Sequence, residues 1–190
     1  MSAAEKITIT FDAQHVAAAV RVQPSAAPSD ALHALDLSDF NGVVVMHGGA
    51  GNMEEHLINS VRTFFAESLA PFAEEYRILI IDGGTQSGTM QAMGDARRIT
   101  GGTYPLLGVC PYKFAAYPGG PEPGEMRWAI DPMHSHFVFV EGDDFGVESE
   151  LLVGMVKGSG KPGIALVVNG GQIVLKEAIS HATQGNTIVT

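Results

Sequence analysis

The sequence predicts an α/β domain: a Rossmann-like, doubly wound fold with a mainly parallel sheet and an N-terminal β-hairpin extension. Short apolar runs, such as residues 43–46 and 78–81, recur along the chain. Four of the runs end in glycine-containing turns, and segments of helical periodicity alternate with the runs. Because continuously apolar strands need cover on both faces, this pattern favours a parallel sheet flanked by helices.

The first 40 residues are predicted to form a hairpin and a linker that pack on the main domain. Residues 6–11 alternate between polar and apolar side chains, and residues 15–22 follow after a short turn. This period of two is typical of paired strands. Residues 24–30 have the composition of a linker. The chain is therefore divided into residues 1–40 and a ligand-binding domain over residues 41–190.

From residue 41 onward, strands alternate with helices. A helix is expected between residues 53 and 69, because one helical face carries Leu57, Ile58, Val61, Phe64, Phe65 and Leu69. After a first strand at residues 42–46, further strands are expected at residues 77–82, 105–110, 135–140 and 163–168. Further helices are expected at residues 87–99 and 147–156, with a closing helix to about residue 181. Four prolines argue against regular structure in residues 112–133.

Composition excludes several classes of function. The 190 residues include 11 Lys and Arg against 21 Asp and Glu, and this net charge of −10 disfavours partners such as nucleic acid or an anionic membrane. The apolar runs are far shorter than the roughly 18 residues of a spanning helix. The single Cys110 cannot form an internal disulfide, and the first residues lack a signal-peptide pattern, so a cytoplasmic location is expected.

The glycine-rich turns are the main functional signal. Parallel strands bring these turns to one edge of the sheet, where helix amino ends and exposed backbone favour an anionic ligand. A nucleotide-like or sugar-phosphate ligand is therefore expected, with no resident cofactor, although glycine also serves turns for purely structural reasons. The predicted ligand-binding residues are Gly48, Gly49, Ala50, Gly51, Asn52, Gly83, Gly84, Thr85, Gln86, Ser87, Gly88, Lys113, Glu141, Gly142, Asp143, Asp144, Phe145, Asn169 and Gly170.

Three segments carry a resemblance to a known family. Residues 82–96, DGGTQSGTMQAMGDA, resemble the GGGxxGLMGxxxxxA segment of the LONELY GUY phosphoribohydrolases. Residues 105–111, PLLGVCP, look like that family's GIxP strand, and GDDFGVESE is similar to its PGGxGTxxE signature, with Gly146 and Glu150 retained. The chain is identified as a member of the SLOG superfamily, most similar to its TRPM-like prokaryotic (LSDAT-type) branch.

The resemblance implies a sensor that binds a nucleotide-derived ligand such as an ADP-ribose relative, and relatives on this fold favour a homo-oligomer, taken here as a dimer. The enzyme branch cleaves N-glycosidic bonds with the signature Glu and an Arg from an MxxRK-type segment. Glu150 matches that Glu, but the preceding residues, DPMHSHFVFVEG, contain no Arg-Lys pair. Binding without turnover is therefore the leading hypothesis. An N-glycosidic nucleotide hydrolase that uses Glu150 is the alternative, and a structural assembly module is the third.

Several other residues suit more than one role. Asp82, Glu141, Asp143 and Asp144 suit hydrogen bonds from ribose hydroxyls, which is the preferred interpretation, or a hard cation. Alternatively, Asp143 and Asp144 cap a helix or lie in a solvated turn. Aromatic residues of the long loop either stack on a base or fix the loop to the core. His134 and His136 form an HxH pair that lacks an obvious third metal ligand, so no metal site is predicted. Gly84→Val is expected to abolish ligand binding in a folded domain.

Overall fold

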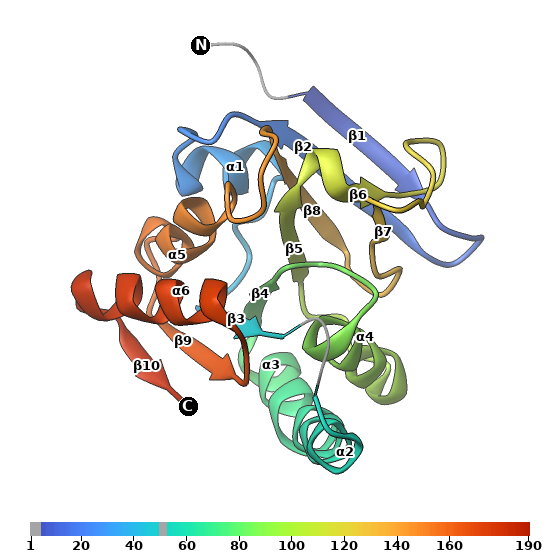
Figure 1. The fold of residues 1–190 in the computed structure, drawn as a ribbon. Coiled ribbons are helices and arrows are strands. Elements are labelled where there is room, and N and C mark those ends of the chain that lie inside the picture. Colours follow the sequence, from blue (N-terminus) through green and yellow to red (C-terminus); the bar gives the residue numbers. More distant parts are fainter. Residues whose placement is uncertain (1–4, 50–52) are drawn as a thin grey trace.

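A computed structural model describes residues 5–49 and 53–190 of the chain. One large sheet crosses the molecule, and helices lie on both of its faces (Figure 1). The strand order is β1-β2-β8-β5-β4-β3-β9-β10. All neighbouring pairs from β2 to β10 are parallel, and β1 alone runs antiparallel to its neighbour β2. The predicted α/β class, with a mainly parallel sheet and an N-terminal hairpin, is confirmed.

The strands and helices of the large sheet alternate as the sequence predicts. The strands of this sheet are β1 (Glu5–Thr10), β2 (Val16–Val22), β3 (Gly42–Gly48), β4 (Ile78–Asp82), β5 (Leu106–Pro111), β8 (His136–Val140), β9 (Gly163–Val168) and β10 (Thr187–Val189). The helices are α1 (Pro28–Ala34), α2 (Glu55–Phe64), α3 (Ala70–Tyr76), α4 (Gly88–Thr100), α5 (Ser149–Gly158) and α6 (Gln172–Thr183).

The core has two faces because successive side chains of each strand point to opposite sides. In β3, Val43 and Val45 pack in a cluster with α1 and α5, whereas Val44 and Met46 pack in a second cluster with α3 and α4. The continuous apolar sequence of the central strands therefore serves two buried layers. A third cluster, around Phe137, lies beneath the hairpin and the segment that follows β5.

The N-terminal hairpin is integrated into the sheet. β2 pairs with β8 in parallel, and β1 forms the outer edge. The linker region contains α1, which packs on α5 where two glycines make room. A Cβ atom at Gly154 or Gly158 would come within 2.9 Å or 2.6 Å, respectively, of the ring of Pro28. The division of the chain into residues 1–40 and 41–190 stays a prediction.

The predicted helix of residues 53–69 is longer than expected. The helical segment continues through a π-helical turn, Phe65–Leu69, into α3 and ends at Arg77, whose φ is 55°. The wider turn precedes Pro71, which has no backbone N–H to donate to the preceding turn. Two further features were not predicted: β10, and a small two-stranded sheet of β6 (Ala115–Ala116) and β7 (Trp128–Ala129) in the long loop.

No helix among the described residues combines the length and the apolar character that crossing a membrane requires.

Candidate functional site

Parallel pairing places the carboxyl ends of β3, β4, β5, β8 and β9 at one edge of the sheet. The four glycine-containing turns follow β3, β4, β8 and β9, so they leave the sheet at this shared edge (Figure 1). Ligands of open α/β sheets bind outside this edge. The amino end of α6 follows the β9 turn at the same edge.

A cleft of about 370 Å³ opens among these strand ends and helices. Its walls come from the ends of β3 and β5, the β4 turn, the start of α4, the β8–α5 connection and the first turns of α6. Of the predicted ligand-binding residues, the cleft is lined by Gly48, Gly49, Gly83, Thr85 and Phe145. The other residues that line it are Met46, His47, Met90, Val109, Cys110, Pro111, Glu148, Leu152, Gly171, Gln172, Ile173, Val174 and Glu177.

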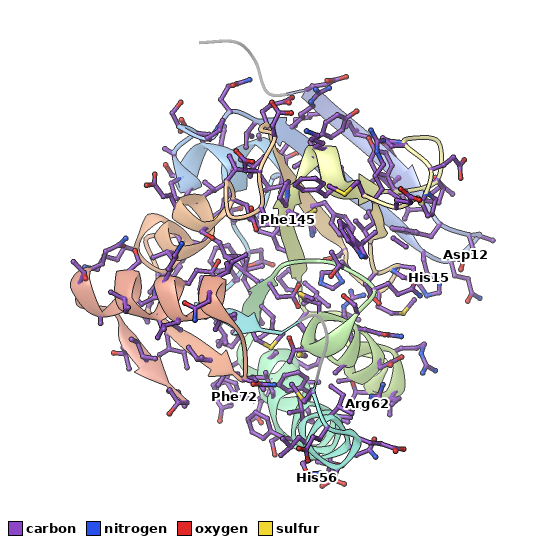
Figure 2. The ribbon with its side chains drawn as sticks, in the orientation of Figure 1. Asp12, His15, His56, Arg62, Phe72 and Phe145 are labelled. Carbon is purple, nitrogen blue, oxygen red and sulfur yellow. The ribbon has the colours of Figure 1, made fainter. Side chains whose placement is uncertain are left out.

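A second, aromatic lobe of about 390 Å³ adjoins the cleft and shares Thr85, Cys110, Pro111 and Phe145 with it. Phe145 stacks on Phe114 with ring centroids 4.0 Å apart. The Trp128 ring contacts Phe145 edge-on, with ring centroids 5.3 Å apart. Phe145 lies at the junction of the two lobes and is half exposed. In Figure 2 it is labelled well away from Phe72 of α3. The predicted Ser87 also lines this lobe.

The remaining predicted site residues lie elsewhere. Ala50, Gly51 and Asn52 fall outside the described residues. Lys113 pairs with Asp143 at 2.9 Å, and Glu141 pairs with Arg21 of β2. The other predicted residues that do not line the cleft or its aromatic lobe are Gly84, Gln86, Gly88, Gly142, Asp144, Asn169 and Gly170.

Most of the turn glycines have packing reasons to be glycine. A Cβ atom at Gly48 would lie 2.1 Å from Thr89 Oγ1, and one at Gly170 would lie 2.5 Å from Val174. Gly84 has a φ of +68°, and a Cβ there would come within 2.7 Å of the Gly108 Cα atom. Gly84→Val is therefore expected to destabilise the domain as well as to affect binding, because this glycine lies against backbone inside the fold.

A buried chain of polar side chains lies behind one wall of the cleft. His47 Nδ1 is 2.8 Å from Glu177 Oε2, and His47 Nε2 is 2.7 Å from His181 Nε2. The Ser149 hydroxyl donates to Glu177 Oε1 at 2.6 Å. Burial, and then the neighbouring His47, lower the pKa of His181 to about 4, so this imidazole is neutral at pH 7.

The carboxyl group of the β8–α5 connection that lines the cleft belongs to Glu148. Its Oε2 accepts a hydrogen bond from the Gly146 N–H at 2.9 Å, and burial raises its pKa. Glu150, the residue that matches the phosphoribohydrolase motif, is exposed and lies in a neighbouring depression with Lys176. α5 begins at Ser149, so the two acidic residues lie on either side of the helix start and face different surroundings.

Cys110 lines both lobes as a buried, unreactive thiol. Burial raises its pKa well above the ordinary range of a thiol. Because the thiolate is the nucleophile, this side chain acts as a small apolar wall at neutral pH.

A second buried histidine lies on the α4 side of the sheet. His134 Nε2 is 2.9 Å from Asp82 Oδ1, and its Nδ1 is 3.2 Å from Asp131 Oδ1. Burial disfavours its charge, but the two carboxylates outweigh burial and raise its pKa to about 9. His136 instead hydrogen-bonds Ser135, and burial lowers its pKa to about 4. Among residues 5–49 and 53–190, no group of three or more His, Cys, Asp or Glu side chains is suited to hold a metal ion.

The fold and the cleft define a Rossmann-like α/β domain with a cavity at the carboxyl edge of its parallel sheet. The family model described as SLOG in TRPM, prokaryote, matches residues 41–190, and the chain belongs to this family. The predicted SLOG membership is therefore confirmed.

One solved structure with a similar fold is the X-ray structure of TM1055, a Northeast Structural Genomics Consortium target. The two chains share 20% sequence identity with a TM-score of 0.55, over 77% of this chain and 72% of that chain. At this identity the likeness shows the fold alone. No curated protein sequence matches the chain.

Sequence reasoning missed the α6 side of the cleft, above all Glu177. Glu177 reaches His47 across 130 residues of sequence, and no local pattern marks such a pair. His47 lies near the end of β3, and this position at a strand end is the only sequence signal for it. Cys110 and Pro111 lie at the end of the strand predicted at residues 105–110, and this position at a strand end could have placed them in the cleft lining.

Proposed function

We propose that this domain binds and senses a nucleotide-derived ligand in the cleft at the carboxyl edge of its sheet. One observation carries the proposal: a cavity at the strand ends adjoins an aromatic lobe, so a sugar and a base would each have a suitable surface. Family membership supports the same class of ligand. A cytoplasmic sensor that passes its bound state to a partner fits these features.

The proposal is tested by thermal-shift and calorimetric titration with ADP-ribose, cyclic ADP-ribose, AMP, NAD and their nucleosides. A ligand at about 100 times its Kd stabilises the folded state by about 2.7 kcal/mol, which is readily measured. Gly171 offers a sharp variant, because it lines the cleft and a Cβ there meets nothing within 4 Å. Gly171→Leu is expected to fill the cleft and abolish binding in a folded protein.

Gly124→Leu is the matched control. A Cβ at Gly124 also meets nothing within 4 Å, and this residue lies in the long loop away from the cleft lining. Binding that survives Gly171→Leu as fully as Gly124→Leu would contradict the proposed site.

Hydrolysis of an N-glycosidic bond is a second candidate function, supported by the raised pKa of Glu148 in the cleft. A carboxyl group whose pKa is raised is better suited to general acid catalysis than an ordinary carboxyl group. Chromatography of AMP and adenosine incubated with the protein would detect free base. Base release that is lost in Glu148→Gln or Glu150→Gln would establish the activity and identify its acid, and no release above background would support binding without turnover.

We also propose that the protein forms a dimer through α2 and α3. Exposed apolar side chains form a stripe along this helical segment, and its members are Leu57, Phe64, Phe72 and Tyr76. Phe72 and Tyr76 pack with ring centroids 4.9 Å apart on the surface. Sedimentation is expected to show a dimer that Phe72→Glu dissociates. A monomeric parent at high concentration would contradict this assignment.

A further inference from the structure

We propose that the cleft selects the uncharged or cationic part of a nucleoside-type ligand and excludes phosphate groups from its interior. The inference rests on the proposed function, since it names the chemical class that the same cleft takes. Its basis is the charge of the lining. Two acidic residues, Glu148 and Glu177, line the cleft, whereas none of its described lining residues is Lys or Arg.

The hydrogen-bonded chain behind the wall is directed at the Glu177 carboxylate. The Asn186 amide donates to His181 Nδ1 at 2.9 Å, so His181, which is neutral, carries its proton on Nε2. That proton is donated to His47 Nε2, and His47 in turn donates from Nδ1 to Glu177. Every donor in the chain therefore points toward the Glu177 carboxylate.

Glu148 adds a second acidic group with free acceptor capacity. Within the part of the chain that the structure describes, one hydrogen bond reaches its side chain, from the Gly146 N–H. The mutual repulsion of Glu148 and Glu177 contributes, after burial, to the raised pKa of Glu148. A phosphate dianion beside this pair would add like charge in a poorly hydrated site, which is unfavourable. A cation or a hydrogen-bond donor would relieve the repulsion.

Two cations at this edge already have partners, and Lys176 lines the neighbouring depression rather than the cleft. Lys113 bonds Asp143, and Arg21 lies between Glu141 and the Tyr112 ring, with its guanidinium carbon 3.7 Å from the ring centroid. Residues 50–52, which are Ala, Gly and Asn, bring no positive charge by sequence.

Four of the described turn glycines also do not contribute to an open phosphate cradle. Protein atoms fill the space beside four of the glycines: Gly48, Gly84, Gly142 and Gly170. A phosphate cradle instead needs glycine backbone that is open to the ligand. The amino end of α6 does face the cleft, but its dipole is worth only about half a positive charge. Two carboxyl groups outweigh it.

The aromatic lobe supplies the surface for the base. Phe145 and Trp128 are 51% and 43% exposed, although rings of this size are normally covered. A flat heterocycle could stack on them, and a cationic ring gains further from the electron-rich faces. A nucleoside, neutral or cationic at its base, matches the lobe and the acidic cleft together.

Matched probes test the inference by calorimetry at constant ionic strength: adenosine against AMP, and nicotinamide riboside against its 5′-phosphate. Each nucleoside is expected to bind at least about tenfold more tightly than its phosphate, a difference of about 1.4 kcal/mol. Glu148→Gln is expected to narrow both ratios. Gly171→Leu is expected to remove nucleoside binding, and Gly124→Leu to preserve it.

The outcomes separate the inference from the proposed function. Phosphorylated probes that bind as tightly as their nucleosides, or more tightly, and lose binding in Gly171→Leu would overturn the inference and leave the proposed function intact. The inference would also be overturned if Glu148→Gln left the ratios of nucleoside affinity to phosphate affinity unchanged. If no probe and no nucleotide bound in a Gly171-dependent way, both would be wrong.

Discussion

Two buried histidine clusters lie on opposite faces of the same sheet, and they differ in what they border. His134 lies between Asp82 and Asp131 on the α4 side, and none of these three residues lines the cleft. On the α5–α6 side, His47 contacts Glu177 and His181, and both His47 and Glu177 line the cleft. The first cluster is closed inside the protein, whereas the second is open to a ligand.

The protonation of the two clusters differs for a physical reason. His134 has a carboxylate at each ring nitrogen, and its pKa rises to about 9 in spite of burial. His181 has another histidine as its neighbour, and its pKa falls to about 4. The same residue type therefore serves in one cluster as a buried cation that joins the loop before β8 to the end of β4. In the other cluster it serves as a neutral link that orients a carboxylate. Five predictions, ordered by size, test this difference.

Removing Asp82 is expected to have the largest effect. Asp82→Ala leaves the charged His134 ring buried with one carboxylate, and breaking a buried pair in this way typically costs about 3–5 kcal/mol. Urea unfolding at pH 7 measures the loss, and Asp144→Ala, at an exposed position, is the control. A loss below about 1 kcal/mol would mean that His134 is not a structural cation.

Gly84→Val tests the packing beside the same cluster. The Gly84 N–H donates to Asp82 Oδ1 at 2.7 Å, and its positive φ and its contact with Gly108 leave no room for a side chain. Backbone strain and overpacking give an expected destabilisation of about 2–4 kcal/mol. At Gly171, on the cleft side, the same substitution is expected to cost less than about 1 kcal/mol. If valine at Gly84 and valine at Gly171 lowered the free energy of unfolding equally, the contrast between the closed His134 cluster and the open cleft would be contradicted.

The pH dependence of stability separates the two histidines. Because the pKa of His134 is raised to about 9 in the folded state, its contribution is complete below about pH 6.5 and is lost as pH rises through 9. Between about pH 7 and 9.5 a decline on the order of 2 kcal/mol is expected. His134→Asn should flatten this alkaline decline.

The acid side follows the opposite rule. The pKa of His181 is lowered to about 4, so its contribution is present above about pH 6.5 and is lost as pH falls through 4. Denaturation curves measured across this range for His181→Asn should lose part of the acid decline and keep the alkaline one. If either variant altered the acid decline and the alkaline decline in stability equally, the two clusters would not be independent.

The smallest expected effect on stability belongs to the cleft cluster itself. Glu177→Gln keeps the shape of the side chain but exchanges charge-assisted hydrogen bonds from His47 and Ser149 for neutral ones, at a cost of about 1 kcal/mol. The ratio of adenosine to AMP affinity should fall in the same variant, as measured by calorimetry. A large stability loss with an unchanged ratio would place Glu177 with the structural cluster instead.

The parts of the fold that local sequence determines were predictable. An uninterrupted apolar strand such as β4 requires two buried faces, and this requirement alone leads to a parallel sheet with its turns at one edge. The helix before β4 was predicted to end too early, because the accommodation of Pro71 by a π turn depends on how Phe65 and Leu69 pack.

The site was predictable only where it coincides with strand ends. Thr85 and Phe145 lie in turns that pattern reasoning identifies, and both line the cleft. Glu148 was missed in favour of Glu150, because a motif match fixes a position in the sequence but not the direction of a side chain near a helix start. The His134–Asp82 contact joins residues 52 apart, and only the folded sheet brings them together.

The position of Asn186 has a practical consequence for handling this protein. It donates to His181 from the turn just before β10, and β10 pairs with β9 at the edge of the sheet. Trimming the final residues, or attaching an affinity tag to them, would disturb the first donor of the chain that ends at Glu177. Purification tags therefore belong at the amino end, beyond β1, where the hairpin lies at the opposite edge of the sheet from this chain (Figure 1).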